Sequence, residues 1–248
     1  MIELKSQREI DNIRKASKIV AEAHQYIAKF VKPGITTAEI DQKVEAFIIE
    51  KGGIPASKGY GGFPGSICLS INEEVVHGIP GSRIVNDGDI VSVDIVVSLN
   101  GYYGDAARTI AVGNVSDAAK KLIEVTEQSF FEGIKYAKEG YRLSDISNAI
   151  QTYVENQNFS VVRDYVGHGI GKKMHEDPQI PNFGPPNRGP RLKKGMVLAI
   201  EPMVNEGVFQ VRTLGDDWTV VTADGKLSAH YENTLVITDG DPEILTVL

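Results

Sequence analysis

The sequence has a single cysteine, Cys68, so an internal disulfide is excluded. Disulfide-dependent proteins belong to oxidising compartments, and this count therefore favours a reducing cytosol. No uninterrupted apolar stretch is long enough to span a membrane, and the first six residues lack the apolar core of a signal peptide. We therefore expect a cytoplasmic protein without a membrane partner.

Basic runs and low-complexity tracts are also missing, and the formal net charge is −7. This charge argues against DNA or a membrane surface as a partner. The 248 residues, 42% of them hydrophobic and 24% charged, have the composition of a globular protein. A chain of this length can bury an ample core in one large domain or two small ones.

A weak internal repeat connects two distant parts of the chain. Residues 32–40 (KPGITTAEI) resemble residues 138–146 (KEGYRLSDI), an offset of 106 positions. In each copy, apolar spacings of three and four predict a long helix before the glycine and a shorter helix after it. Thr36 and Glu39 form a capping-box pattern at the first shorter helix. The apolar stripe of the first long helix is Ile13, Ala16, Val20, Ala23, Ile27 and Phe30, and we expect Pro33-Gly34 to end that helix.

Strand-rich sequence follows each predicted helix pair, so the order helix-helix-strands occurs twice. This order predicts an α+β fold with two pseudo-equivalent halves around one sheet system. The expected repeats run roughly over residues 8–112 and 114–238.

Acidic residues interrupt or adjoin several apolar, strand-like runs. A carboxylate in a half-buried strand is costly unless something neutralises its charge. Four acids together with one imidazole make the oxygen-rich donor set expected of a paired divalent-metal site, which points to hydrolysis. The candidate ligands are Asp94, Asp105, His168, Glu201 and Glu232.

A hairpin predicted at Asn100-Gly101 places two of these carboxylates. With a two-residue turn, Asp94 and Asp105 point to the same face as diagonal neighbours, about 7–8 Å apart at the backbone. That separation suits two metal ions roughly 3.5–4 Å apart. A salt bridge to Arg108 is the alternative, but Arg108 has the opposite parity and is expected to point away.

The histidines need separate treatment. His168 has glycines on both sides, which let the backbone pass close to an ion, and we expect it in a loop. His77 and His175 lack the helical spacing of metal ligands. For His24 and His230 the sequence favours ordinary, solvent-exposed side chains.

Taken together, these motifs resemble the type I methionine aminopeptidases, in their short bacterial form. The resemblance extends over nearly the whole chain and implies one catalytic domain, residues 1–248, with the pita-bread metallopeptidase fold. In that fold two pseudo-symmetric α-β halves surround a curved antiparallel sheet. The matching segments are residues 70–80, 94–95, 104–109, 167–171, 199–203 and 228–234.

The resemblance also implies a role for each candidate ligand. Asp105 and Glu232 match ligands that bridge two divalent ions, His168 and Glu201 complete one site, and Asp94 completes the other. Co²⁺, Mn²⁺, Fe²⁺ and Zn²⁺ all suit this donor set, and the sequence does not choose among them.

Further residues match the catalytic and substrate-binding positions of the family. His77 and His175 match its two catalytic histidines, and Glu201 is expected to shuttle a proton. Met174 stands where an aromatic residue is frequent, and Phe63 where a tyrosine is common. The implied methionine pocket consists of Tyr60, Phe63, Cys68 and Trp218, with His77 and His175 beside it.

The implied activity is removal of the N-terminal methionine from nascent proteins and peptides with a small second residue. A hydroxide generated at the dinuclear metal centre attacks the first peptide bond. The expected partners are the N-termini of nascent polypeptides, with transient ribosome contact, and the protein is expected to be a monomer.

Several relatives of this fold are weaker alternatives. X-Pro dipeptidases and aminopeptidases usually carry an additional N-terminal domain, and type II methionine aminopeptidases carry a helical insertion. Creatinase-like enzymes lack the metals. A non-catalytic binding protein of the same shape typically loses ligands, whereas this sequence retains all five.

Overall fold

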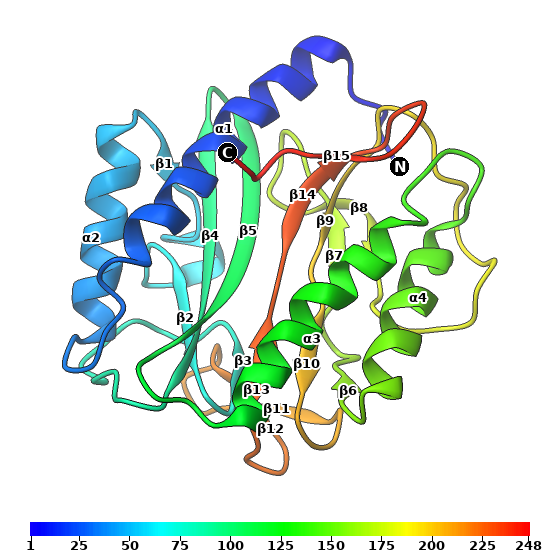
Figure 1. Cartoon of the computed structure of the whole chain (residues 1–248). Coiled ribbons are helices and arrows are strands. Elements are labelled where there is room, and N and C mark those ends of the chain that lie inside the picture. The colour runs from blue at the N-terminus through cyan, green and yellow to red at the C-terminus, as the bar shows by residue number, and fades with distance from the viewer.

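Two pairs of helices cover the antiparallel strands of the chain, and the computed structural model describes all of residues 1–248 (Figure 1). The first pair is α1 (Gln7–Ile27) and α2 (Thr37–Glu50), and the second is α3 (Asp117–Ile134) and α4 (Leu143–Asn156). None of these helices combines the length and the apolar character that crossing a membrane requires.

The strands that follow the first helix pair form a four-stranded antiparallel sheet, in which β4 pairs with β1, β2 and β5. A short 3₁₀ helix, η1 (Tyr60–Gly62), and the short strand β3 lie in the same part of the chain. The strands are β1 (Ile54–Pro55), β2 (Cys68–Ile71), β3 (Glu74–Val76), β4 (Ile90–Leu99) and β5 (Tyr102–Ala111).

The strands that follow the second helix pair form a five-stranded sheet in the order β15-β14-β9-β7-β8 and a three-stranded sheet in the order β13-β10-β6. A third small sheet joins β11 and β12 to β3 of the first half. The strands are β6 (Ser160–Val161), β7 (Gly167–Gly169), β8 (Glu176–Ile180), β9 (Val197–Ile200), β10 (Met203–Asn205), β11 (Val211–Thr213), β12 (Val220–Thr222), β13 (Ser228–His230), β14 (Asn233–Val236) and β15 (Glu243–Ile244).

The turn inside each helix pair has the same geometry at the repeat offset of 106 positions. Gly34 and Gly140 both have a φ of 93°, a left-handed value that glycine adopts without steric cost. Thr36 and Arg142, also 106 positions apart, are the N-caps of α2 and α4. The N–H of each donates to an acid three residues later, Glu39 or Asp145, and Thr36 also accepts a bond from the Glu39 N–H. The equivalence of the whole halves remains a prediction.

The first helix is shorter than its apolar stripe predicts. It ends at Ile27, and Phe30 lies in the following turn, where its N–H donates to the Ile27 carbonyl at 2.8 Å. Pro33 disfavours a helical conformation in the residue before it, and the chain leaves the helix before reaching that point. The predicted extension to Pro33 was therefore wrong.

The β4–β5 hairpin has the predicted register. Asp94 lies opposite Ala107, and Asp105 lies opposite Val96. Because side chains alternate between the two faces of a strand, both carboxylates point to one face of the sheet. The hairpin prediction is confirmed.

Buried apolar side chains gather in two main clusters, one in each half. The first lies between α1, α2 and the β4 sheet, and the second between α3, α4 and strands β9, β10, β13 and β14. In Figure 1, β5 and β14 run past each other in the centre of the molecule, where the halves meet. We call this meeting of β5 with residues 231–234 the seam.

Helix α1 packs directly on β5 at Gly104. A Cβ at this position would lie 2.6 Å from the Ser17 backbone nitrogen. We therefore expect Gly104→Ala to lower the free energy of unfolding by about 1–3 kcal/mol, the usual effect of overpacking, as measured by urea denaturation. Gly215→Ala is the control because a Cβ there meets nothing within 4 Å. Equal unfolding midpoints for the two variants would contradict the prediction.

Candidate metal centre and active site

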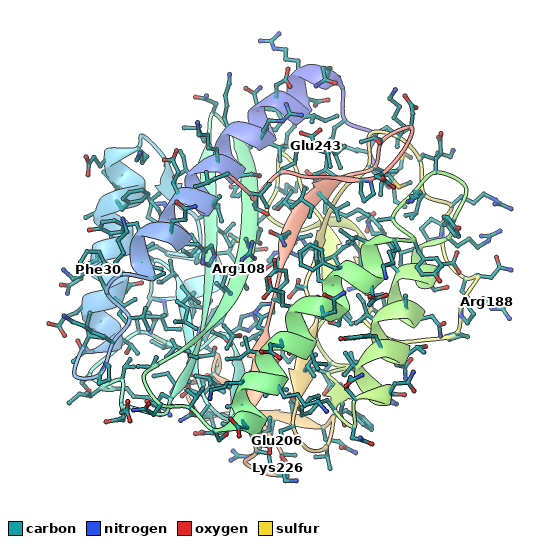
Figure 2. The ribbon with its side chains drawn as sticks, viewed as in Figure 1. Phe30, Arg108, Arg188, Glu206, Lys226 and Glu243 are labelled. Atoms are coloured by element: carbon teal, nitrogen blue, oxygen red, sulfur yellow. The ribbon has the colours of Figure 1, made fainter.

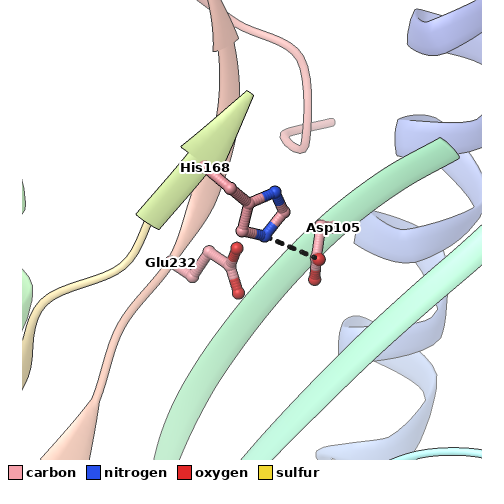
Figure 3. A group of neighbouring side chains, drawn as sticks. All are labelled: Asp105, His168 and Glu232. Atoms are coloured by element: carbon pink, nitrogen blue, oxygen red, sulfur yellow. Dashed lines mark ion pairs between the residues drawn. The ribbon is translucent and has the colours of Figure 1, made fainter. Parts of the chain in front are cut away.

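The five predicted ligands converge from both sides of the seam. Asp94 and Asp105 come from β4 and β5, His168 comes from β7, Glu201 follows β9, and Glu232 lies between β13 and β14. The His168 Nε2 atom is 3.7 Å from Asp105 Oδ2 and 3.6 Å from Glu201 Oε1. Figure 3 shows Asp105, His168 and Glu232 turned toward one another from three separate segments.

The short strand β7 fixes His168, so its predicted placement in a loop was wrong. Its Nδ1 is 2.9 Å from the Gly169 carbonyl and donates to it, which leaves the lone pair of Nε2 facing the carboxylates. The flanking glycines allow neighbouring strands to approach closely. A Cβ on Gly167 would lie 2.4 Å from the Ala199 carbonyl, and one on Gly169 would lie 2.1 Å from the Asp177 carbonyl.

Two histidines that the sequence assigned to the surface are buried. His230 is 1% exposed, and its Nε2 lies 3.6 Å from Glu201 Oε2. His24 lies beneath β5, with Nε2 2.9 Å from the Ala106 carbonyl. One feature of the sequence could have identified His230: it lies two residues before Glu232 and therefore on the same strand face. That feature alone did not distinguish it from an ordinary surface histidine.

Unpartnered buried atoms at this place fit a bound cation. Asp94 Oδ1, Asp105 Oδ1, Glu232 Oε1 and His230 Nε2 are all buried without a hydrogen-bond partner. Such atoms are rare in folded proteins because each costs free energy, so several together require a common partner. Two overlapping triads have ligand atoms within 4.8 Å of one another: Asp105, His168 and Glu232, and Glu201, His230 and Glu232.

Burial and mutual repulsion raise the pKa values of the clustered acids. Burial, followed by the charge of Glu201, raises the pKa of Asp94 to about 6. Burial raises the pKa of Glu201 to about 8. The pKa values of Asp105 and Glu232 lie well above their ordinary values for the same reasons. Without a cation the cluster therefore holds protons near neutral pH, among them the proton of Glu201, and a divalent ion can replace them.

A cavity of about 220 Å³ opens beside the carboxylates. The ring centroids of Phe63 and Trp218 in its wall are 5.2 Å apart in an edge-to-face arrangement. Tyr165, which sequence reasoning missed, also lines it, with its ring edge-on to His77 at 5.5 Å. All predicted pocket residues line the cavity, together with Met174: Tyr60, Phe63, Cys68, His77, His175 and Trp218.

The two remaining predicted histidines lie on the cavity wall. The rings of His175 and His168 have centroids 4.4 Å apart, and the Tyr60 hydroxyl lies 2.7 Å from His175 Nδ1. His77 has a φ of 59°, a conformation that costs energy outside glycine and is frequent at functional sites. Burial lowers the pKa of His77 to about 4 and also lowers that of His175, so both rings are neutral at pH 7.

Comparison with known proteins gives the class of the chain. Residues 11–239 match the sequence profile of metallopeptidase family M24. The chain belongs to this family.

Its similar relatives within the family are methionine aminopeptidases. The chain is 62% identical over 246 residues to methionine aminopeptidase 1 of Bacillus subtilis, covering 99% of both sequences. It is 60% identical to the methionine aminopeptidase of Clostridium perfringens, covering 100% of both. The resemblance to the short bacterial type I form is therefore confirmed.

Solved structures agree with this assignment. Methionine aminopeptidase from Thermotoga maritima superposes with a TM-score of 0.98 at 47% identity, covering 100% of both chains. Prolidase from Pyrococcus furiosus has a TM-score of 0.81 at 22% identity, covering 99% of this chain and 65% of that chain, which is a likeness of fold alone. The predicted α+β pita-bread fold is confirmed, and family membership together with the carboxylate-histidine cluster supports divalent-metal binding.

Proposed function

We propose that this metallopeptidase removes the N-terminal methionine from nascent proteins and peptides and prefers a small second residue. The observation that carries the proposal is an apolar-walled cavity that ends at a buried cluster of carboxylates and imidazoles. Such a cavity suits a thioether side chain beside a hydrolytic centre. Relatives of this chain with more than 40% sequence identity are named methionine aminopeptidases.

Two divalent ions, Co²⁺, Mn²⁺, Fe²⁺ or Zn²⁺, are the proposed cofactor. Asp94, Asp105, His168, Glu201 and Glu232 are the residues that would hold them. The unpartnered buried oxygens and the two overlapping triads, which have Glu232 in common, support this assignment. When bound, the ions supply Lewis acidity and lower the pKa of water.

The protein side chains supply proton transfer and orientation. Glu201 is the proposed proton shuttle, since its buried carboxylate lies 3.6 Å from both His168 and His230. Donation from the Tyr60 hydroxyl to His175 Nδ1 leaves the Nε2–H of His175 as a donor for the oxyanion that develops at the attacked carbonyl. His77, on the cavity wall, is proposed to contact the scissile amide.

The pocket for methionine is proposed to include Cys68 as a neutral thiol. Cys68 lies opposite Asp94 in the β2–β4 register and is 8% exposed. Burial, and then the neighbouring charges of Asp94 and Asp105, raise the pKa of the thiol well above its ordinary value. A thiol in this state is a small apolar group that suits a thioether neighbour.

The test is release of free methionine from Met-Gly-Met-Met by metal-stripped protein titrated with Mn²⁺ or Co²⁺. An Ala-Pro peptide is assayed in parallel. Metal-dependent methionine release with an intact Ala-Pro peptide is the expected result. Cleavage only before proline would assign the chain to prolidase activity, and no cleavage with any metal would contradict a catalytic role.

Tyr60→Phe tests the proposed role of His175. Loss of the hydroxyl removes one hydrogen bond, so we expect kcat for methionine release to fall about tenfold, roughly 1.4 kcal/mol, with KM little changed. Tyr26→Phe is the control, because Tyr26 on α1 stacks on Phe47 of α2 and does not line the cavity. A kcat for Tyr60→Phe equal to that of the control would rule out this role for the hydroxyl.

Further parts of the sequence prediction remain proposals. We propose that the substrates are N-termini of nascent polypeptides, met through transient contact with the ribosome, and that the enzyme acts as a cytoplasmic monomer. We also propose that residues 1–248 form one catalytic domain, with pseudo-repeats over roughly 8–112 and 114–238. The matched turns at Gly34 and Gly140 support the repeat.

A further inference from the structure

Arg108 occupies the seam beside two of the proposed metal ligands. It lies on β5, three positions after Asp105, and Figure 2 shows it between β5 and β14. Only one residue of β5, Ala107, forms backbone hydrogen bonds with Glu232 across the seam. The Glu232 N–H donates to the Ala107 carbonyl at 3.0 Å, and the Ala107 N–H donates to the Glu232 carbonyl at 3.4 Å. Regular strand pairing therefore contributes little to the alignment of Asp105 with Glu232.

The guanidinium of Arg108 supplies additional bonds across this connection. Its Nη1 donates to the carbonyls of Ala107, at 2.7 Å, and of Glu232, while Nη2 donates to Asn233 Oδ1 at 2.6 Å. The guanidinium carbon lies 4.4 Å from the centroid of the Tyr231 ring. One side chain on β5 thus contacts three consecutive residues on the other side of the seam.

The acceptor Asn233 is itself held in place. It is fully buried, and its Oδ1 accepts a second hydrogen bond, from Thr246 Oγ1 at 2.8 Å. Arg108 therefore bonds to a fixed acceptor. The rigid fork of a guanidinium transmits such a constraint better than a flexible ammonium group.

Arg108 is only partly exposed, yet none of its hydrogen bonds goes to a carboxylate. All its acceptors are neutral oxygens, which compensate the desolvation of a cation less well than a carboxylate does. Simple charge pairing thus does not explain this arginine. Across the seam it donates instead to the backbone carbonyl of Glu232 and to the side chain of Asn233.

We propose that Arg108 is a positioning residue that fixes the spacing of Asp105 and Glu232 across the seam and so strengthens divalent-metal binding. The inference rests on the ligand assignment of the proposed function. Groups that orient metal ligands typically change metal affinity 10- to 100-fold when they are removed. Because Arg108 contacts the Glu232 backbone, it acts through the position of that residue and not as a ligand.

The test is calorimetric titration of the metal-stripped full chain with Mn²⁺. We expect Arg108→Met to bind Mn²⁺ about 10- to 100-fold more weakly than the wild-type protein. Arg108→Lys retains the charge but loses the fork, and its affinity is expected to lie close to that of Arg108→Met. The control is Arg163→Met, which removes an arginine stacked on Phe209 at 3.9 Å that bonds to none of the proposed ligands.

Thermal unfolding of each metal-free variant separates positioning from folding. Weaker binding by Arg108→Lys at an unchanged unfolding midpoint supports the proposal even if Arg108→Met is poorly folded. Wild-type affinity in Arg108→Lys would overturn it, because charge alone would then be sufficient. Wild-type affinity in a folded Arg108→Met would also overturn it. A wild-type protein that binds Mn²⁺ but releases no methionine would contradict only the proposed activity.

Discussion

Glu201→Gln is expected to reduce kcat for methionine release by about 10³-fold, within the range of general acid-base catalysis. Glutamine has nearly the same shape as glutamate, but it cannot accept a proton. Glu201 also places a carboxylate within 3.6 Å of two imidazoles in a site crowded with negative charge. Burial raises the pKa of Glu201 to about 8, so without metal this side chain must take up a proton on folding, which costs free energy at neutral pH. Glutamine avoids that cost, so the metal-free variant should unfold at a higher temperature than the metal-free wild type at pH 7.

The two effects are measured on the same preparation, with methionine release at saturating Mn²⁺ and calorimetric unfolding in the presence of a chelator. Glu50→Gln on α2, an exposed position, makes the same chemical change far from the site and should alter neither quantity. A Glu201→Gln variant that keeps more than a tenth of the wild-type kcat would exclude the proton-shuttle role.

The stability of the metal-free protein is expected to fall as the pH rises from about 4 to about 8. The pKa of Asp94 in the folded chain is raised to about 6 and that of Glu201 to about 8, both by burial. For an acid whose folded pKa is raised, the stability contribution is fully present below the unfolded pKa and is lost as the pH passes through the folded pKa. Ionisation of these two buried acids should cost on the order of several kcal/mol.

A divalent ion removes this cost because it stabilises the ionised carboxylates. The gap between the unfolding temperatures with Mn²⁺ and with a chelator should therefore widen between pH 5 and pH 8. For a chain of this length, the widening should be on the order of 10 °C. The double variant Asp94→Asn, Glu201→Gln provides the control, since its metal-free profile should be flatter. Parallel wild-type profiles with and without metal would refute the argument.

The sequence predicted local geometry where a single segment determines it. Asn100-Gly101 defines a two-residue turn, and the turn alone fixes which residues of β4 and β5 face each other. The capping box at Thr36 similarly marked the start of α2. Strand propensity could not predict the strand at His168, because that strand has only three residues and two of them are glycine.

Features that depend on several distant segments could not be obtained from local patterns. His230 lies beside the proposed ligands only because Glu201, which follows β9, comes within 3.6 Å of it. The cross-seam bonds of Arg108 likewise depend on where residues 231–233 come to lie. Parity along β5 predicted that this side chain points away from the carboxylates but could not show what it contacts. The resemblance to a known family provided the long-range information that periodicity lacked.

The seam has a consequence for the order of folding events. Asp94 and Glu232 are 138 positions apart, and the cluster is complete only after β5 and the segment before β14 have met. An ion held there closes a very long chain loop, so its binding free energy includes the entropy of that closure. The ion then stabilises only the closed native chain, which couples unfolding of either half to metal concentration. We therefore expect the folded fraction of the protein to rise with metal concentration.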